Sequence, residues 1–219
     1  MKIPFAELLI SVKIEEAANF SGNFMILAHG AGTGMDHPHL NELCLVFLSQ
    51  GINVVRFNFP YRERGKSIPD KMPVLVDCYQ KVIEWVKREY QPKRLFCGGH
   101  SMGGRVASMI AAGDQKPFDG LLLFSYPLHP PGKPEKLRVD HLKDIIMPVL
   151  CFNGTNDDFC SPELMNNQLK LLGKNWTMHW INEADHGLQV KKKSGKSRQT
   201  VLKEIQDVIQ NWVSGLKFV

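Results

Sequence analysis

Short runs of apolar residues alternate with amphipathic stretches along nearly the whole chain, and this alternation constrains the fold more than any other feature. Apolar strands that are separated by helices are typical of a mostly parallel sheet with both faces covered. We therefore predict an α/β fold with a sheet of about seven strands and helices on both faces. The predicted buried strands are Phe24–Ala28, Ile52–Phe57, Arg94–Gly98, Gly120–Ser125, Val149–Asn153 and Thr177–Ile181, and Leu8–Ile14 is predicted to form an edge strand.

The amphipathic stretches predict helices between these strands. Apolar residues recur at i, i+3, i+4, i+7 and i+8 over residues 40–48, which places them on one side of a helix. Similar stripes run through residues 75–86, 164–172 and 201–212. The stripe at 164–172 is preceded by Ser161-Pro162-Glu163, a cap, a proline and an acid that are favoured where helices begin. No repeat or Gly/Ser/Pro-rich linker interrupts the pattern, so we expect one domain over residues 1–219.

The composition is that of a folded globular chain. Hydrophobic residues make up 43% and charged residues 22%, which excludes a disordered, collagenous or coiled-coil chain. No apolar run approaches the ~20 residues that a membrane-spanning helix needs, so we expect no membrane span. Glu7 and Lys13 interrupt the apolar N-terminal stretch, which is therefore not predicted to be a secretory signal.

The net charge of +5 comes from one short segment. Residues 191–198 contain Lys191, Lys192, Lys193, Lys196 and Arg198 and no acid, so the rest of the chain is neutral overall. A nucleic-acid-binding protein usually carries a basic stripe on its folded face, and we expect no nucleic-acid partner here. Runs of like charge usually remain in water, so a solvated loop is favoured over docking to a membrane or a nucleic acid.

The cysteine and histidine patterns predict neither disulfides nor a metal site. The five cysteines lie mostly within apolar stretches, where a free thiol behaves as a small core residue. This indicates a reducing compartment, and we expect a cytoplasmic protein. In the segment Asp36-His37-Pro38-His39 the proline prevents helical presentation of both imidazoles, so a helix start is favoured over a metal site. We expect no cofactor.

The segment Gly99-His100-Ser101-Met102-Gly103 is the strongest functional signal. It follows a predicted strand and opens a helix rich in small residues, as a nucleophile elbow requires. Glycine at both ends leaves room for a tight turn that presents the Ser101 hydroxyl at the end of the sheet. In the alternative interpretation, Ser101 merely caps the helix that follows.

A serine nucleophile needs a base and an acid that orients the base. In this type of fold they follow in the order Ser, Asp or Glu, His. Asp157 follows the strand at 149–153, and His186 lies in a polar loop after the next strand. Asp158 is the alternative acid, and Asp185 is expected to stabilise the histidine loop.

Acyl transfer also needs donors for an oxyanion. The backbone N–H of Met102 directly follows the serine, and a second donor is expected from the glycine-rich loop after the strand at 24–28. We assign Ala31 there, with Gly30 as the alternative. No Lys-Ser/Thr pair follows these glycines, which excludes a phosphate-binding loop, and their spacing is not that of a dinucleotide site. His29 either contributes to substrate binding with Gly30 or supports the loop from beneath.

The chain resembles the α/β-hydrolase superfamily, and more closely the branch of small predicted hydrolases that includes testis-expressed hydrolase-like proteins and relatives near the dienelactone hydrolases. The matching segments are HGAG at 29–32, HPHL at 37–40, GHSMGG at 99–104, SYPLHPPGKPEKLR at 125–138, GTND at 154–157 and EADHGL at 183–188. The resemblance implies that Ser101, Asp157 and His186 are nucleophile, acid and base. Dienelactone hydrolases use a cysteine nucleophile, so Ser101 departs from that chemistry.

The segment after the strand at 120–125 is too short and too rich in proline to form a cap domain. Tyr126, Leu128 and His129 are its candidate substrate contacts, and a rigid wall that makes no contact is the alternative.

These observations predict a serine hydrolase that cleaves a small ester, thioester or amide through an acyl-enzyme. The alternative is a protein of the same fold that binds a partner without catalysis. The substrate and the oligomeric state stay open.

Overall fold

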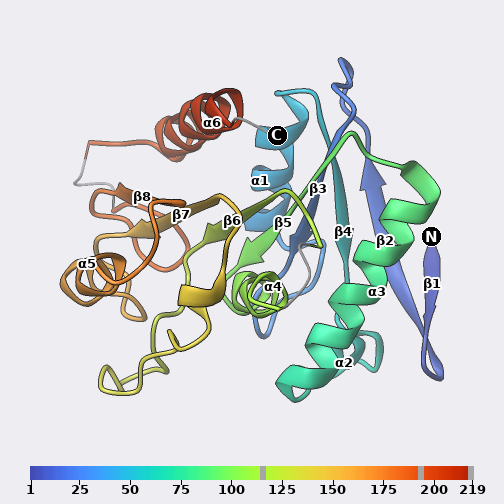
Figure 1. Ribbon diagram of the computed structural model, residues 1–219, viewed down its shortest axis with the longest axis horizontal. Helices are drawn as coiled ribbons and strands as arrows, with labels where there is room; N and C mark the ends of the chain where they lie inside the picture. Colours follow the sequence, from blue (N-terminus) through green and yellow to red (C-terminus); the bar gives the residue numbers. More distant parts are fainter. Residues whose placement is uncertain (114–116, 192–194, 217–219) are drawn as a thin grey trace.

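The computed structural model describes residues 1–113, 117–191 and 195–216, and in it one eight-stranded sheet runs through the chain (Figure 1). The strand order is β1-β2-β4-β3-β5-β6-β7-β8, and the strands from β4 to β8 in this order are parallel. The predicted mostly parallel sheet is therefore confirmed. The bounds are β1 Lys2–Phe5, β2 Leu8–Glu15, β3 Asn23–Ala28, β4 Ile52–Phe57, β5 Arg94–His100, β6 Gly120–Phe124, β7 Val149–Gly154 and β8 Trp176–Ile181.

The N-terminal strands correct one prediction. Leu8–Ile14 was expected at the edge of the sheet, but β2 lies between β1 and β4 and pairs antiparallel with both. The edge is β1, a four-residue strand that contains Pro4. A proline cannot donate to a strand ladder, and this loss is tolerated at an edge. Because β1 is short and interrupted by Pro4, its apolar pattern is too weak to be recognised in the sequence.

Helices cover both faces of the sheet, as predicted. One apolar core lies beneath α1 and α6, and a second lies beneath α3 and α4 with Met165 of α5 (Figure 1). Phe96 and Cys97 are neighbours on β5 and belong to opposite cores, as the alternation of side chains along a strand requires. The helix bounds are α1 Pro38–Leu48, α2 Pro60–Glu63, α3 Met72–Tyr90, α4 Met102–Ala111, α5 Pro162–Leu169 and α6 Arg198–Gly215.

Local signals in the sequence set several helix starts. Ser161 caps α5 by accepting a hydrogen bond from the Leu164 N–H, with Pro162 as the first helical residue. Pro38 likewise opens α1, so the histidine segment at 36–39 forms a helix start. Within the described ranges, no group of three or more His, Cys, Asp or Glu side chains is arranged to hold a metal ion.

The basic segment agrees with the predicted solvated loop at Lys191, which is exposed, and departs from it at Lys196 and Arg198. Lys192 and Lys193 lie outside the described residues. Lys196 forms an ion pair with Glu204, and Arg198 is the first residue of α6 and pairs with Glu42. Arg198 is therefore an anchor between α6 and α1, because its guanidinium finds fixed partners on the folded surface. Across the described residues, no helix combines the length and apolar character that crossing a membrane requires.

The connection between β6 and β7 carries no separate cap domain. In the described part of this connection the only helix is the short 3-10 turn Leu142–Asp144. No second layer of helices in the described structure therefore covers the ends of the central strands.

All five cysteines are free and buried.

Candidate active site

Ser101 lies in the sharp turn between β5 and α4. Its backbone has φ 50° and ψ −115°, a conformation that side chains rarely adopt. Gly99 and Gly103 make the turn possible, since a Cβ on either would lie 2.3 Å or 2.6 Å from the carbonyl oxygen of Ala28 on β3. The turn is thus pressed against the neighbouring strand. Strain of this kind persists where the surrounding structure enforces it, and it is concentrated at functional sites.

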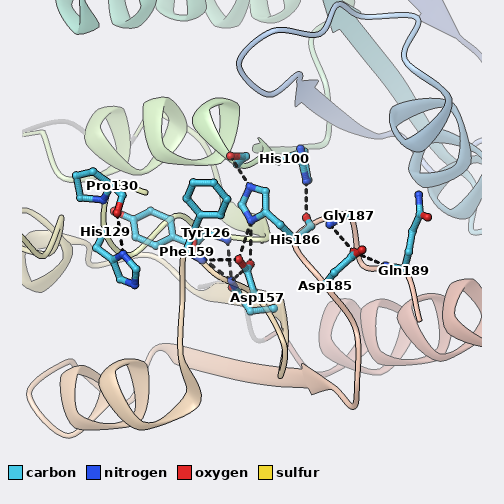
Figure 2. A network of polar contacts seen from close by, with 12 residues as sticks. His100, Tyr126, His129, Pro130, Asp157, Phe159, Asp185, His186, Gly187 and Gln189 are labelled. Atoms are coloured by element: carbon cyan, nitrogen blue, oxygen red, sulfur yellow. Dashed lines mark hydrogen bonds and ion pairs between the residues drawn. The ribbon is translucent and has the colours of Figure 1, made fainter. Parts of the chain in front are cut away.

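Ser101, His186 and Asp157 form one hydrogen-bonded chain. The Ser101 hydroxyl lies 2.8 Å from Nε2 of His186, and Nδ1 of His186 lies 2.9 Å from both carboxylate oxygens of Asp157. Figure 2 shows the His186 ring directed toward Asp157. The structure therefore brings together three residues that follow β5, β7 and β8, at the end of the sheet where ligands bind in such folds.

Asp157 is held as an acceptor. Its side chain is fully buried, and it accepts hydrogen bonds from the Phe159 N–H and from the side-chain amide of Asn153 as well as from His186. Asp158, the alternative acid, is exposed to solvent. The choice between the two adjacent residues follows from the turn after β7, which directs the first carboxylate inward.

The loop that carries His186 is anchored by its neighbours. Asp185 accepts hydrogen bonds from the N–H groups of Gly187 and Gln189, as expected for a residue that stabilises the loop (Figure 2). The His100 Nε2–H donates to the His186 carbonyl at 2.9 Å. Burial lowers the pKa of His100 to about 4, so its imidazole is neutral at pH 7. The Phe159 ring packs against His186 with ring centres 4.4 Å apart.

A second set of hydrogen bonds supports this loop from Arg198 on α6, and we call it the Arg198 brace. The Arg198 guanidinium donates to the Leu188 carbonyl, to the Glu42 carboxylate and to Nδ1 of His39. His39 packs edge-on against His100, which binds the His186 carbonyl. Two helices on one face of the sheet therefore hold the histidine loop in place.

The glycine-rich loop after β3 lies beside the serine. The Gly30 carbonyl accepts hydrogen bonds from Nδ1 of His29 and from the Thr33 and Tyr61 hydroxyls. His29 is buried and its Nε2 accepts from the Phe59 N–H. Burial lowers the pKa of His29 to about 4 and keeps the ring neutral. His29 thus has the supporting position beneath the loop that the sequence left as one alternative.

A cavity of about 510 Å³ opens onto the Ser101 side chain. This size suits a small-molecule ligand. The residues that line it are Gly30, Ala31, Thr33, Pro69, Asp70, Met72, Leu75, His100, Ser101, Met102, Arg105, Pro127, Pro131, Arg138, Phe159 and His186.

The loop after β6 contacts the cavity through other residues than those expected. Tyr126 and Leu128 are fully buried in the core, and the Tyr126 hydroxyl donates to the Arg138 carbonyl. His129 is also buried, and its Nδ1 bonds the Pro130 carbonyl. Pro127 and Pro131 line the cavity instead. Because the large side chains of this loop pack in the core, Pro127 between them and Pro131 beyond them form the wall.

Several residues of the site are not identifiable from the sequence. Asn153, Phe159 and Arg198 support the hydrogen-bonded chain from positions with no motif of their own. Arg105 and Arg138 line the cavity, and Arg105 lies one helical turn beyond the serine, a spacing that could have flagged it. The other contacts depend on segments far apart in the sequence.

The chain belongs to the α/β hydrolase domain family, whose model matches residues 21–214. This agrees with the superfamily that the sequence motifs indicate.

Solved structures of low sequence identity share the fold. Est1E from Butyrivibrio proteoclasticus, in a structure with bound ferulic acid, has a TM-score of 0.80 and 16% identity, covering 98% of each chain. An α/β serine hydrolase without a lid from Xanthomonas campestris has a TM-score of 0.77 and 20% identity, covering 98% of this chain and 92% of that chain. A dienelactone hydrolase from Anabaena variabilis has a TM-score of 0.75 and 15% identity, covering 98% and 95%.

Proposed function

We propose that this protein is a serine hydrolase that cleaves a small ester, thioester or amide. The observation that carries the proposal is the chain from Ser101 through His186 to Asp157, with contacts of 2.8 and 2.9 Å. Hydrogen-bond contact between nucleophile and base, and between base and orienting acid, is what an activated serine needs. Ser101 and His186 of this hydrogen-bonded chain line a cavity whose size suits a small substrate.

In the acylation step, the Ser101 oxygen attacks the substrate carbonyl while His186 Nε2 takes the hydroxyl proton. Asp157 holds the imidazole in the required tautomer and stabilises its positive charge. His186 then gives the proton to the leaving group. In the second step, water attacks the acyl-enzyme with His186 again as base, and Ser101 is regenerated.

The oxyanion of each tetrahedral intermediate is assigned to the backbone N–H groups of Met102 and Ala31. Met102 is the first residue of α4, whose first N–H groups have no partner within the helix. Three donors hold the Gly30 carbonyl. In a planar trans peptide the carbonyl and the following N–H point in opposite directions, so fixing the Gly30 oxygen also fixes the Ala31 N–H. This supports Ala31 over Gly30 as the second donor.

The first test is Ser101→Ala on a panel of short-chain p-nitrophenyl esters. We expect kcat to fall by roughly 10⁴- to 10⁶-fold, because only binding and the oxyanion donors remain. Ser214→Ala, which removes a solvent-exposed hydroxyl far along α6, is the matched control and should retain wild-type turnover.

A fluorophosphonate probe gives an independent readout of the same serine. The folded wild-type protein should be labelled, and Ser101→Ala should not. Wild-type turnover by the alanine variant, or a folded protein that neither reacts with the probe nor hydrolyses any ester, contradicts the proposal. The latter result would favour a binding protein with this fold.

A further inference from the structure

Two arginines line the cavity, beyond the residues that the proposed reaction uses. Arg105 comes from α4 and Arg138 from the connection between β6 and β7, and both are half-buried. Among the described residues, neither side chain has a carboxylate within ion-pair distance. Nε of Arg105 is buried without a hydrogen-bond partner there. Buried polar groups are usually hydrogen-bonded, so the Arg105 guanidinium keeps a donor that a ligand in the cavity can use.

Both arginines start from fixed backbone positions. The Arg105 N–H donates to the Ser101 carbonyl at 3.0 Å, so the two residues are one helical turn apart on the same side of α4. The Arg138 N–H donates to the Leu128 carbonyl, and its own carbonyl accepts from the Tyr126 hydroxyl, each at 2.7 Å. Both side chains therefore start from hydrogen-bonded backbone beside the cavity that Ser101 also lines.

The two arginine charges lie close enough to affect each other. Burial and the neighbouring Arg105 charge lower the pKa of Arg138 below its ordinary value. His141, which bonds Ser108 on α4, is neutral because burial, with Arg105 adding to the effect, lowers its pKa to about 4. Asp70 is the acidic residue in the described cavity wall; its Oδ1 is paired with Arg64, while its Oδ2 is buried without a hydrogen-bond partner there.

We propose that the acyl group of the substrate ends in a carboxylate, which Arg105 and Arg138 bind while its other end lies against Ser101. A planar carboxylate matches the paired donors of a guanidinium. The apolar wall formed by Met72, Leu75 and Phe159 suits the methylene chain between the two ends. The preferred substrates are thus short dicarboxylic acids in which one carboxyl group forms the ester, thioester or amide and the other is a free carboxylate. This inference rests on the proposed function.

The test compares an anionic ester with its uncharged analogue. Mono-p-nitrophenyl glutarate and adipate carry the free carboxylate, and their methyl-capped forms have the same chain without the charge. With spontaneous hydrolysis subtracted, the wild-type protein should favour the anionic esters in kcat/KM. Arg105→Met and Arg138→Met should each lower kcat/KM on the anionic esters by about 10- to 100-fold, the size of a lost charge-assisted hydrogen bond.

The neutral esters and a surface variant serve as controls. Both arginine variants should lose much less kcat/KM on the methyl-capped esters than on the anionic esters, since the lost interaction is with the carboxylate. Arg88→Met removes an arginine on α3 whose side chain is 70% exposed, and it should leave kcat/KM on both kinds of ester unchanged. If a methionine variant does not fold, the wild-type preference for the anionic ester should still fall as NaCl is raised.

The outcomes separate this inference from the proposed function. Hydrolysis of both ester types without a preference for charge, or equal losses on both in the arginine variants, overturns the carboxylate site and leaves the serine hydrolase intact. Failure to hydrolyse any ester and to react with a fluorophosphonate overturns the proposed function. In that case free glutarate should still raise the melting temperature of the wild-type protein but not of Arg105→Met, and no shift in the wild-type protein also overturns the carboxylate site.

Discussion

The molecule contains two buried polar networks that use the same chemistry in different settings. Around Asp157, a fully buried carboxylate holds a histidine whose far side reaches Ser101 and a cavity. Around Arg56 on β4, a guanidinium with 1% exposure is held by Glu15 of β2, by Asn41 of α1 and by the Met35 carbonyl. Arg56 is not among the described cavity-lining residues.

The difference between the networks lies in what the last member contacts. The partners of Arg56 are provided by the protein itself, so the network joins β2, β4 and α1. The Asp157 network ends at a hydroxyl that faces the cavity, so one of its members stays available for reaction. Burial and hydrogen bonding alone therefore do not identify a functional site, and the proposed site differs because its network ends at a hydroxyl that lines a cavity.

Asp157→Asn is expected to have the largest effect that distinguishes the networks. An amide in this position no longer enforces the tautomer in which His186 accepts the Ser101 proton, so kcat should fall by roughly 10⁴-fold. KM should change little, because Asp157 does not line the cavity in the described structure. Steady-state kinetics on a p-nitrophenyl ester, with the rate of fluorophosphonate labelling, measures this. A loss confined to KM would contradict the assigned role.

Arg56→Met tests the closed network. Removing this side chain leaves Glu15 and two acceptors without their partner, and we expect the free energy of unfolding to fall by about 3 kcal/mol. Ester hydrolysis by the folded variant should stay within about threefold of wild type, since the hydrogen bonds of Arg56 go to Glu15, Asn41 and Met35 and none goes to Ser101, His186 or Asp157. Urea denaturation and steady-state kinetics measure the two quantities. The double variant Glu15→Gln/Arg56→Met removes the unpaired charge as well and should be more stable than Arg56→Met alone.

Much of the fold could be predicted because its signals are local. The buried strands and the starts of α1 and α5 are marked by apolar runs, Pro38 and Ser161. That Ser101 and His186 lie together could be predicted because the order of strands and loops places both at one edge of the sheet. The strand β1 was not predicted, since its short, Pro4-containing pattern is weak and its pairing is set by β2.

The walls of the site could not be predicted, because side-chain direction in a loop depends on tertiary packing. Tyr126 and Leu128 turn into the core, while Pro127 between them lines the cavity. Arg198 supports the His186 loop through hydrogen bonds to Leu188, which is 10 positions away in the sequence, and to His39, which is 159 positions away. No local sequence pattern reveals these contacts. The basic composition of residues 191–198 predicted a solvated loop, but Arg198 in this segment is held by Glu42 and the Leu188 carbonyl.

The smallest expected effect concerns His39, which links the histidine loop to α6, and it appears as a change in pH dependence. Burial lowers the pKa of His39 to about 2, below its ordinary value of 6.5. Between about pH 6 and pH 4 the unfolded chain therefore binds a proton at this residue that the folded chain does not, so stability falls as pH falls, by at most about 1.4 kcal/mol per pH unit.

His39→Asn should flatten this pH dependence without cutting the brace. The asparagine oxygen can replace Nδ1 of His39 as the acceptor for Arg198, which now lies 2.7 Å away. The variant should therefore lose less stability than the wild-type protein between pH 6 and pH 4, while ester hydrolysis at pH 7 stays near wild type. Urea denaturation across this pH range measures the slope. Parallel curves for the two proteins would show that His39 stays neutral in the unfolded chain or is protonated in the folded one, and would contradict the prediction. A flattened curve with normal hydrolysis would show that this brace, unlike the Asp157 network, supports the loop without taking part in proton transfer.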